Sequence, residues 1–193
     1  MEGTETHRRW LQRATLYALS MTAAGAATGV AFAAAGVAVS MLWPDMTLPL
    51  AVALGAVAFV YALHELEFLR LPVPGRDWQV PADWVREGFY RSAVIFGGAV
   101  GFGVFTRIPY ASLPILLAWL FVSGNVVYGV LAGLVYGALR ALSIYSSAPA
   151  QDTDDLVRLN QRLMRLGAVP AHQVTGLLLA AFAAYLLVGP NLP

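Results

Sequence analysis

The stretch Gly101-Phe102-Gly103-Val104-Phe105-Thr106-Arg107-Ile108-Pro109 lies within residues 92–139, a run in which Arg107 is the only charged side chain. A charge so deep in an apolar segment is costly unless it is paired, hydrated or placed in a cavity. Pro109 removes a backbone donor and disfavours helix in the residue before it. The stretch therefore predicts a broken membrane helix. We expect a ligand-binding or gating site there, formed by Gly101, Gly103, Thr106, Arg107 and Pro109.

Composition indicates an integral membrane protein. Of the 193 residues, 59% are hydrophobic and only 12% are charged, whereas a soluble domain carries about 25% charged residues. The net charge of +1 gives no electrostatic basis for nucleic-acid binding. The chain has no cysteine and no lysine, which excludes disulfides, thiolate metal sites and lysine nucleophiles carried by the chain itself. The use of arginine without lysine, together with many alanines, is typical of GC-rich bacterial genomes. We therefore expect the protein to lie in the bacterial cytoplasmic (plasma) membrane.

Five segments are apolar over a length that suits a membrane helix, which needs about 20 residues. They cover residues 16–42, 48–69, 92–123, 126–144 and 174–188. The third segment would be about 48 Å long as a straight helix, which is more than a bilayer core requires. It must therefore tilt, unwind or dip as a re-entrant element near Arg107, or else divide into two short spans.

The positions of the arginines decide between these topologies. Arginines cluster before the first span, in the connector 70–91, and around residues 140–165. The positive-inside rule places all three groups on the cytoplasmic side. A single broken crossing for residues 92–123 satisfies the rule, whereas two full crossings would put the last group outside. We therefore predict an all-α polytopic membrane bundle with about five crossings, a cytoplasmic N-terminus and an outside C-terminus.

The chain is expected to form one membrane domain, residues 1–193, with two cytoplasmic loops. Loop 70–91 contains Arg76, Trp78, Gln79 and Trp84, and its tryptophans favour either simple membrane anchoring or a docking and gating loop. Loop 146–171 is expected to hold a short amphipathic helix, because acidic residues precede leucines at helical spacing. This helix would lie on the inner membrane surface or pack on the cytoplasmic loops.

Small residues mark faces where helices can approach closely. Gly129, Gly133 and Gly137 form one ladder on the fourth span, and Gly25 and Gly29 form another on the first. The ladders predict helix packing within the bundle or, alternatively, a homo-oligomer interface. The glycines between residues 97 and 103 either pack in the same way or line a cavity or hinge beside the charged break.

A possible polar cluster of His64, Glu65 and Glu67 lies near the cytoplasmic end of the second span. His64 and Glu67 are three residues apart and would share a helical face. Histidine and glutamate can bind a metal or relay protons, but an interfacial network of glutamate and arginine is the favoured interpretation. His172 is expected at the start of the last span.

Several motifs, covering about a third of the chain, carry a family resemblance. They read Arg76-x-Trp78-Gln79-Val80-x5-Arg86, Gly97-x3-Gly101-x-Gly103-x2-Thr106, Gly124, and Gly137-x2-Arg140-Ala141-Leu142. This segment, residues 76–142, resembles actinobacterial multipass proteins similar to the cytochrome c biogenesis (CcdA/DsbD-type) transmembrane family or to methylamine-utilisation membrane proteins. The biogenesis family moves reducing equivalents through intramembrane cysteines beside prolines. Because Arg107 stands where such a cysteine would be, the resemblance implies the scaffold of broken helices without the redox activity.

Two functions fit these observations. The first is transport, in which Arg107 binds a small anionic solute in a central cavity or salt-bridges a gate. The second is that of a non-catalytic subunit, which scaffolds or stabilises a larger membrane complex with other proteins or with its own copies in the lipid bilayer. A membrane enzyme, or a haem held by His64 and His172, is disfavoured because suitable residues are few. We therefore expect no enzymatic activity, no cofactor and no metal.

Overall fold

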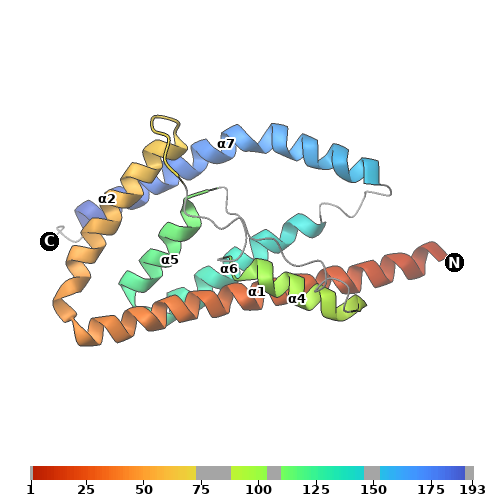
Figure 1. Cartoon of the computed structure of the whole chain (residues 1–193), viewed down its shortest axis with the longest axis horizontal. Helices are drawn as coiled ribbons and strands as arrows, with labels where there is room; N and C mark the ends of the chain where they lie inside the picture. Colours follow the sequence, from red (N-terminus) through yellow and green to blue (C-terminus); the bar gives the residue numbers. More distant parts are fainter. Residues whose placement is uncertain (1, 73–87, 104–109, 146–152, 190–193) are drawn as a thin grey trace. The chain divides into compact units, whose positions relative to one another are not determined.

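The computed structural model describes residues 2–72, 88–103, 110–145 and 153–189, and in these ranges the chain is helical apart from short connections. The elements, coloured along the chain in Figure 1, are α1 (Glu2–Leu42), the 3-10 helix η1 (Pro44–Met46), α2 (Thr47–Glu65), α4 (Phe89–Gly101), α5 (Ser112–Ser123), α6 (Val126–Tyr145) and α7 (Thr153–Val188). The all-α class predicted from the sequence is confirmed.

Three helices in the described part of the chain are long and apolar enough to cross a membrane. They cover Arg8–Leu42, Pro44–Glu65 and Pro170–Val188. Two shorter apolar helices, Ser112–Ser123 and Val126–Leu142, accompany them. Many large apolar side chains on these helices are exposed, as contact with lipid requires. These features indicate a membrane protein, and the number of five crossings stays a prediction.

The described residues form two compact units. Unit 1 contains residues 2–31, 88–103 and 127–145, and so joins most of α1 to α4 and α6. Unit 2 contains residues 32–72, 110–126 and 153–189, and so joins the end of α1 to α2, α5 and α7.

In unit 1, α1 and α6 meet backbone against backbone. A Cβ atom added to Gly29 would lie 2.0 Å from the carbonyl oxygen of Gly129, and one on Gly133 would lie 2.2 Å from that of Gly25. Real Cβ atoms do not approach other atoms so closely. Hydrogen is the only side chain that fits, so the glycine ladders of α1 and α6 pack on each other within one chain.

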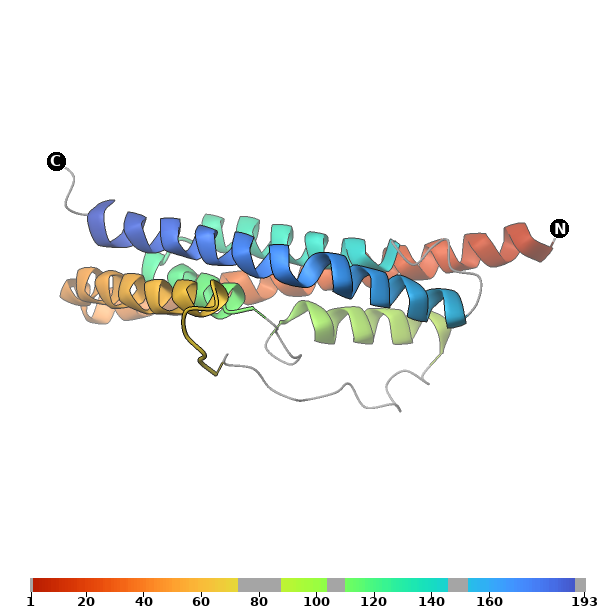
Figure 2. The same cartoon turned by 90° about the horizontal axis from the view of Figure 1, so that it is seen from above.

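Helix α4 lies beside α1 in the same unit (Figure 2). The hydroxyl of Ser20 on α1 donates a 2.6 Å hydrogen bond to the carbonyl oxygen of Val94 on α4. A Cβ on Gly97 would lie 2.5 Å from the carbonyl oxygen of Tyr17. Small residues on α4 therefore allow α1 to approach it, as they do on α6.

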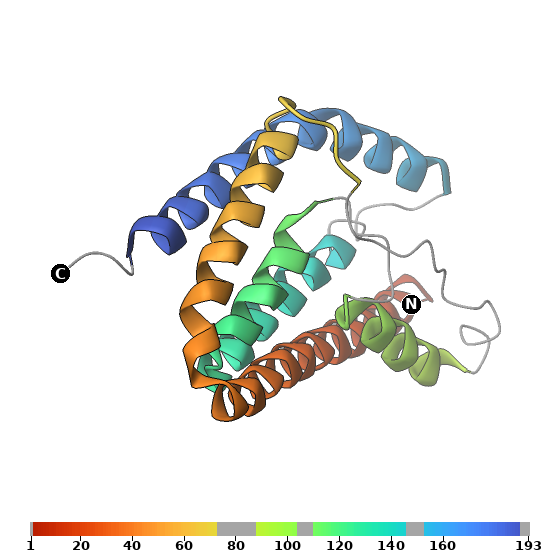
Figure 3. The same cartoon turned by 60° about the vertical axis from the view of Figure 1, so that its left-hand side comes forward.

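In unit 2, α2 packs along α7 and against α5 (Figure 3). The buried residues that these helices share are Leu54, Ala58 and Ala62 from α2, Leu179, Ala183 and Leu186 from α7, and Ala111 and Ile115. Trp119 of α5 meets Phe182 of α7 edge to face, with ring centroids 6.1 Å apart. The three helices thus surround one apolar core, and residues at their ends are brought together.

The structure corrects the prediction of a separate amphipathic helix in loop 146–171. Helix α7 is continuous from Thr153 to Val188, with Pro170 inside it, so the expected helix and the last span are one element. Pro170 removes one backbone hydrogen bond, but membrane helices tolerate such a loss. Pro170 therefore does not end the helix.

The predicted interruption of the third apolar segment is present. Helix α4 ends at Gly101 and α5 begins at Ser112. Gly103 has a φ of 69°, in the left-handed region that favours glycine. Whether α4 and α5 together make one crossing stays a prediction.

Candidate functional site: a buried glutamate and histidine in unit 2

Glu65, the last residue of α2, is the most deeply buried carboxylate among the described residues. Its side chain has no exposed surface, although it lies in a helix of high mean hydropathy. An ionisable group inside a membrane helix bundle is expensive and marks a candidate functional site. Its partners therefore determine what the site can do.

Two groups donate hydrogen bonds to Glu65, one to each carboxylate oxygen. The backbone N–H of Ala111 donates to Oε1 at 2.8 Å. Nδ1 of His172, on α7, lies 2.5 Å from Oε2. Beside them, the ring of Tyr110 packs on the imidazole with a centroid distance of 4.8 Å. The carboxylate therefore joins the end of α2, the start of α5 and α7.

The local sequence explains why a carboxylate is needed at this point. Helix α5 begins after Ala111, which has no side chain that could cap the helix. The first N–H groups of a helix have no partner within it. Glu65 supplies an anionic acceptor to the N–H of Ala111, at the positive end of the α5 dipole.

The pair of Glu65 and His172 joins a buried carboxylate to a partly exposed imidazole. The side chain of His172 is 36% exposed, while that of Glu65 is fully buried. With both oxygens of Glu65 already bonded, the carboxylate is arranged to hold helices together.

The other members of the predicted polar cluster lie elsewhere. The prediction that His64 and Glu67 share a helical face is wrong, because α2 ends at Glu65. Glu67 is exposed, with a φ of 65°. It occupies the left-handed position of a Schellman motif, in which the N–H of Phe68 bonds to the carbonyl of Leu63.

His64 secures the turn that follows α2. The N–H of Leu71 donates to its Nδ1 at 3.0 Å. The same Nδ1 lies 3.2 Å from the carbonyl oxygen of Leu69, so the ring contacts two residues of this turn. Tyr61 holds the same segment, since its hydroxyl donates to the carbonyl oxygen of Pro72 at 3.1 Å. His64 therefore bonds to the loop that follows α2, whereas Glu65 bonds to residues in the core of unit 2.

The predicted site around Arg107 is described only in part. Thr106, Arg107 and Pro109 lie outside the described residues, as do Arg76, Trp78, Gln79 and Trp84 of the docking loop. Gly101 packs on α1, where a Cβ would lie 2.4 Å from the carbonyl oxygen of Met21. Gly101 therefore has a packing role in unit 1, and gating or ligand binding at this segment stays a prediction.

Sequence reasoning named Glu65 and placed His172 at the start of the last span, but it did not join them. They are 107 residues apart, and no motif links them. One signal was available: a glutamate and a histidine, each in an apolar helix, need a partner. The apolar helices of this chain hold few ionisable groups. Glu65 and His172 could therefore have been proposed as hydrogen-bond partners.

Comparison with known proteins points to one group of relatives. The chain is 30% identical over 153 residues to the methylamine utilization protein MauF of Methylophilus methylotrophus, which covers 77% of this chain and 51% of the relative. It is 31% identical over 93 residues to MauF of Paracoccus versutus, and this match covers 47% of this chain and 34% of the relative. The chain thus spans about half or less of the length of these relatives.

No protein-family model matches the chain, and no solved structure matches it. The resemblance to methylamine-utilisation proteins is therefore supported, whereas that to the cytochrome c biogenesis family is not.

Proposed function

We propose that this protein is a non-catalytic accessory subunit of a membrane system for methylamine utilisation. The observation that carries this proposal is the similarity to MauF over 153 residues. The subunit would sit in the bacterial cytoplasmic membrane with about five crossings, the N-terminus inside and the C-terminus outside, as the arginine distribution favours.

The geometry of unit 2 supports an accessory role. Glu65 is fully buried, and its two oxygens are bonded to the backbone of α5 and to His172. A carboxylate held in this way stabilises a helix arrangement and is shielded from a solute. The glycine ladders of α1 and α6 pack on each other and are not available to another protein. Partner proteins would therefore bind the exposed apolar faces of the helices.

Native mass spectrometry of the protein from its own host tests this proposal. Membranes from cells grown on methylamine and on an ammonium salt would be solubilised gently and compared. We expect a complex with at least one other membrane protein, more abundant after growth on methylamine. A lone chain in both preparations would contradict the accessory role, and an equal amount of the same complex would contradict the link to methylamine.

Transport of a small anionic solute is the second candidate. The interruption between α4 and α5 favours it, because helix ends inside a membrane bundle can bind ions. Arg107 would bind the anion, and Arg107→Ala should then abolish solute uptake into proteoliposomes while the protein still folds. Arg70→Ala, which removes an exposed arginine of unit 2, is the matched control. Unchanged uptake by the Arg107 variant would refute this role.

A further inference from the structure

A pocket of about 460 Å³ opens in unit 1 between α1, α4 and α6. Three aromatic side chains, Trp10, Tyr17 and Phe96, form much of its wall. Tyr17 and Phe96 stack with ring centroids 5.7 Å apart and an interplanar angle of 27°. The pocket therefore offers a broad apolar surface to any molecule that enters it.

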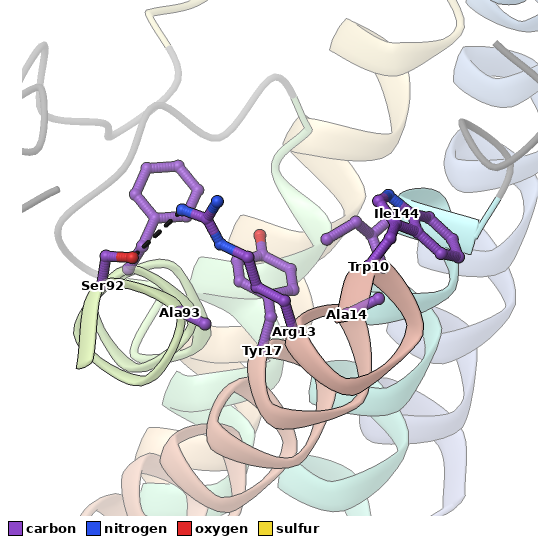
Figure 4. Close-up of a pocket in the computed structure, with 8 residues that line it drawn as sticks. Trp10, Arg13, Ala14, Tyr17, Ser92, Ala93 and Ile144 are labelled. Atoms are coloured by element: carbon purple, nitrogen blue, oxygen red, sulfur yellow. Dashed lines mark hydrogen bonds between the residues drawn. The ribbon is translucent and has the colours of Figure 1, made fainter. Parts of the chain in front are cut away.

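One edge of the pocket is polar. Arg13 on α1 reaches across to α4, where its Nη2 donates a 3.0 Å hydrogen bond to Oγ of Ser92 (Figure 4). Ser92 is only 2% exposed, and both side chains line the pocket. A guanidinium and a hydroxyl at one edge suit an oxyanion such as phosphate.

Arg13 is the charged side chain among the described residues that line this pocket. A guanidinium at the edge of an apolar pocket attracts anions and repels cations. The ligand of the pocket should therefore carry a negative charge.

The residues around the pocket are of the kinds that concentrate where a membrane protein meets the headgroups. The apolar run of α1 begins near residue 16, directly after Arg13. Trp10 packs edge to face on Tyr145 at the end of α6, with centroids 6.4 Å apart. Tyr90, at the start of α4, donates a 3.2 Å hydrogen bond to Oε1 of Gln12. Tryptophan and tyrosine concentrate at this depth of a bilayer.

We propose that this pocket binds an anionic membrane phospholipid, with the phosphate at Arg13 and Ser92 and an acyl chain along the aromatic wall. Basic pockets between membrane helices on the cytoplasmic side are suited to anionic headgroups. A free phosphate would use only the polar edge and leave the aromatic wall in water. The lipid matches both halves of the pocket. This inference does not depend on the role in methylamine utilisation.

Lipid retention by the full chain, measured by native mass spectrometry from micelles, tests the proposal. Phosphatidylglycerol and phosphatidylcholine would be titrated separately, with inorganic phosphate as a competitor. We expect preferential retention of phosphatidylglycerol and no displacement by millimolar phosphate. Arg13→Gln should weaken retention about tenfold, because a charge-assisted hydrogen bond is lost.

Three variants separate the pocket from general charge and folding effects. Arg70→Gln removes the same charge in unit 2 and should retain the lipid like the wild type. Arg13→Lys keeps the charge and should bind better than Arg13→Gln. Phe96→Ala truncates a side chain that is 37% exposed, so the fold should survive while retention falls, even if Arg13→Gln does not fold.

Equal retention of the two lipids would overturn the proposal, and so would equal effects of Arg13→Gln and Arg70→Gln. Displacement by inorganic phosphate would assign the site to a free anion instead of a lipid.

Discussion

Gly29→Ala is expected to be the most damaging single-methyl change in unit 1. Its Cβ would lie 2.0 Å from the carbonyl oxygen of Gly129 and 2.8 Å from the carbonyl carbon. Both atoms belong to backbone, which cannot rotate away as a side chain can. We expect a loss of about 3 kcal/mol in the free energy of unfolding, the upper end of typical overpacking costs. Unfolding by sodium dodecyl sulfate in mixed micelles, followed by circular dichroism, measures this loss.

Gly98→Ala is the matched control for this prediction. Gly98 is also helical, but its nearest foreign atom is Oγ of Ser20 at 3.4 Å, which is an ordinary van der Waals distance. Alanine is a better helix former than glycine by about 1 kcal/mol, so this variant should be as stable as the wild type or slightly more stable. Equal stability of the Gly29 and Gly98 variants would show that α1 and α6 do not cross at these glycines.

Glu65→Ala is expected to produce the second large effect, through unit 2. The substitution leaves the N–H of Ala111 and the imidazole of His172 without their common acceptor. Breaking a buried pair by removing one member costs about 3–5 kcal/mol. We expect about 3 kcal/mol, the lower end, because the partially exposed side chain of His172 can be hydrated. The same unfolding measurement applies.

Two conservative variants identify the cause of this loss. Glu65→Gln keeps an acceptor for Ala111 and a polar group for His172, so it should recover most of the stability that Glu65→Ala loses. Glu67→Gln removes a charge two residues away, from an exposed side chain, and should change stability by less than about 0.5 kcal/mol. If Glu67→Gln were as damaging as Glu65→Ala, the charge of the α2 end would matter and the buried hydrogen bonds would not.

Local features of the sequence predicted the helices well. An apolar run of about 20 residues is a direct requirement of the bilayer, and residues 16–42 and 48–69 correspond to α1 and α2. The division of α7 into a short surface helix and a separate last span was wrong. The cost of Pro170 inside a helix, about 3 kcal/mol, can be met by packing elsewhere along that helix. Here Leu179, Ala183 and Leu186 of α7 are buried against the core of unit 2.

The candidate site depended on pairings that a single sequence does not contain. Periodicity tells which residues share a helical face, but it does not tell which helix covers that face. The glycine ladders of α1 and α6 were therefore both recognisable, whereas their packing on each other was not. For the same reason Glu65 was grouped with its neighbours in sequence, although its partners come from α5 and α7.

The bond between Glu65 and His172 sets a sequence of events during synthesis. Glu65 leaves the ribosome 46 residues before Ala111 and 107 residues before His172. At about 5–20 residues per second, the histidine follows roughly 5–20 seconds later. During this interval α2 carries an acidic group whose histidine partner has not been made. Assembly of unit 2 therefore cannot finish helix by helix from the N-terminus, and α2 must wait for the last helix of the chain.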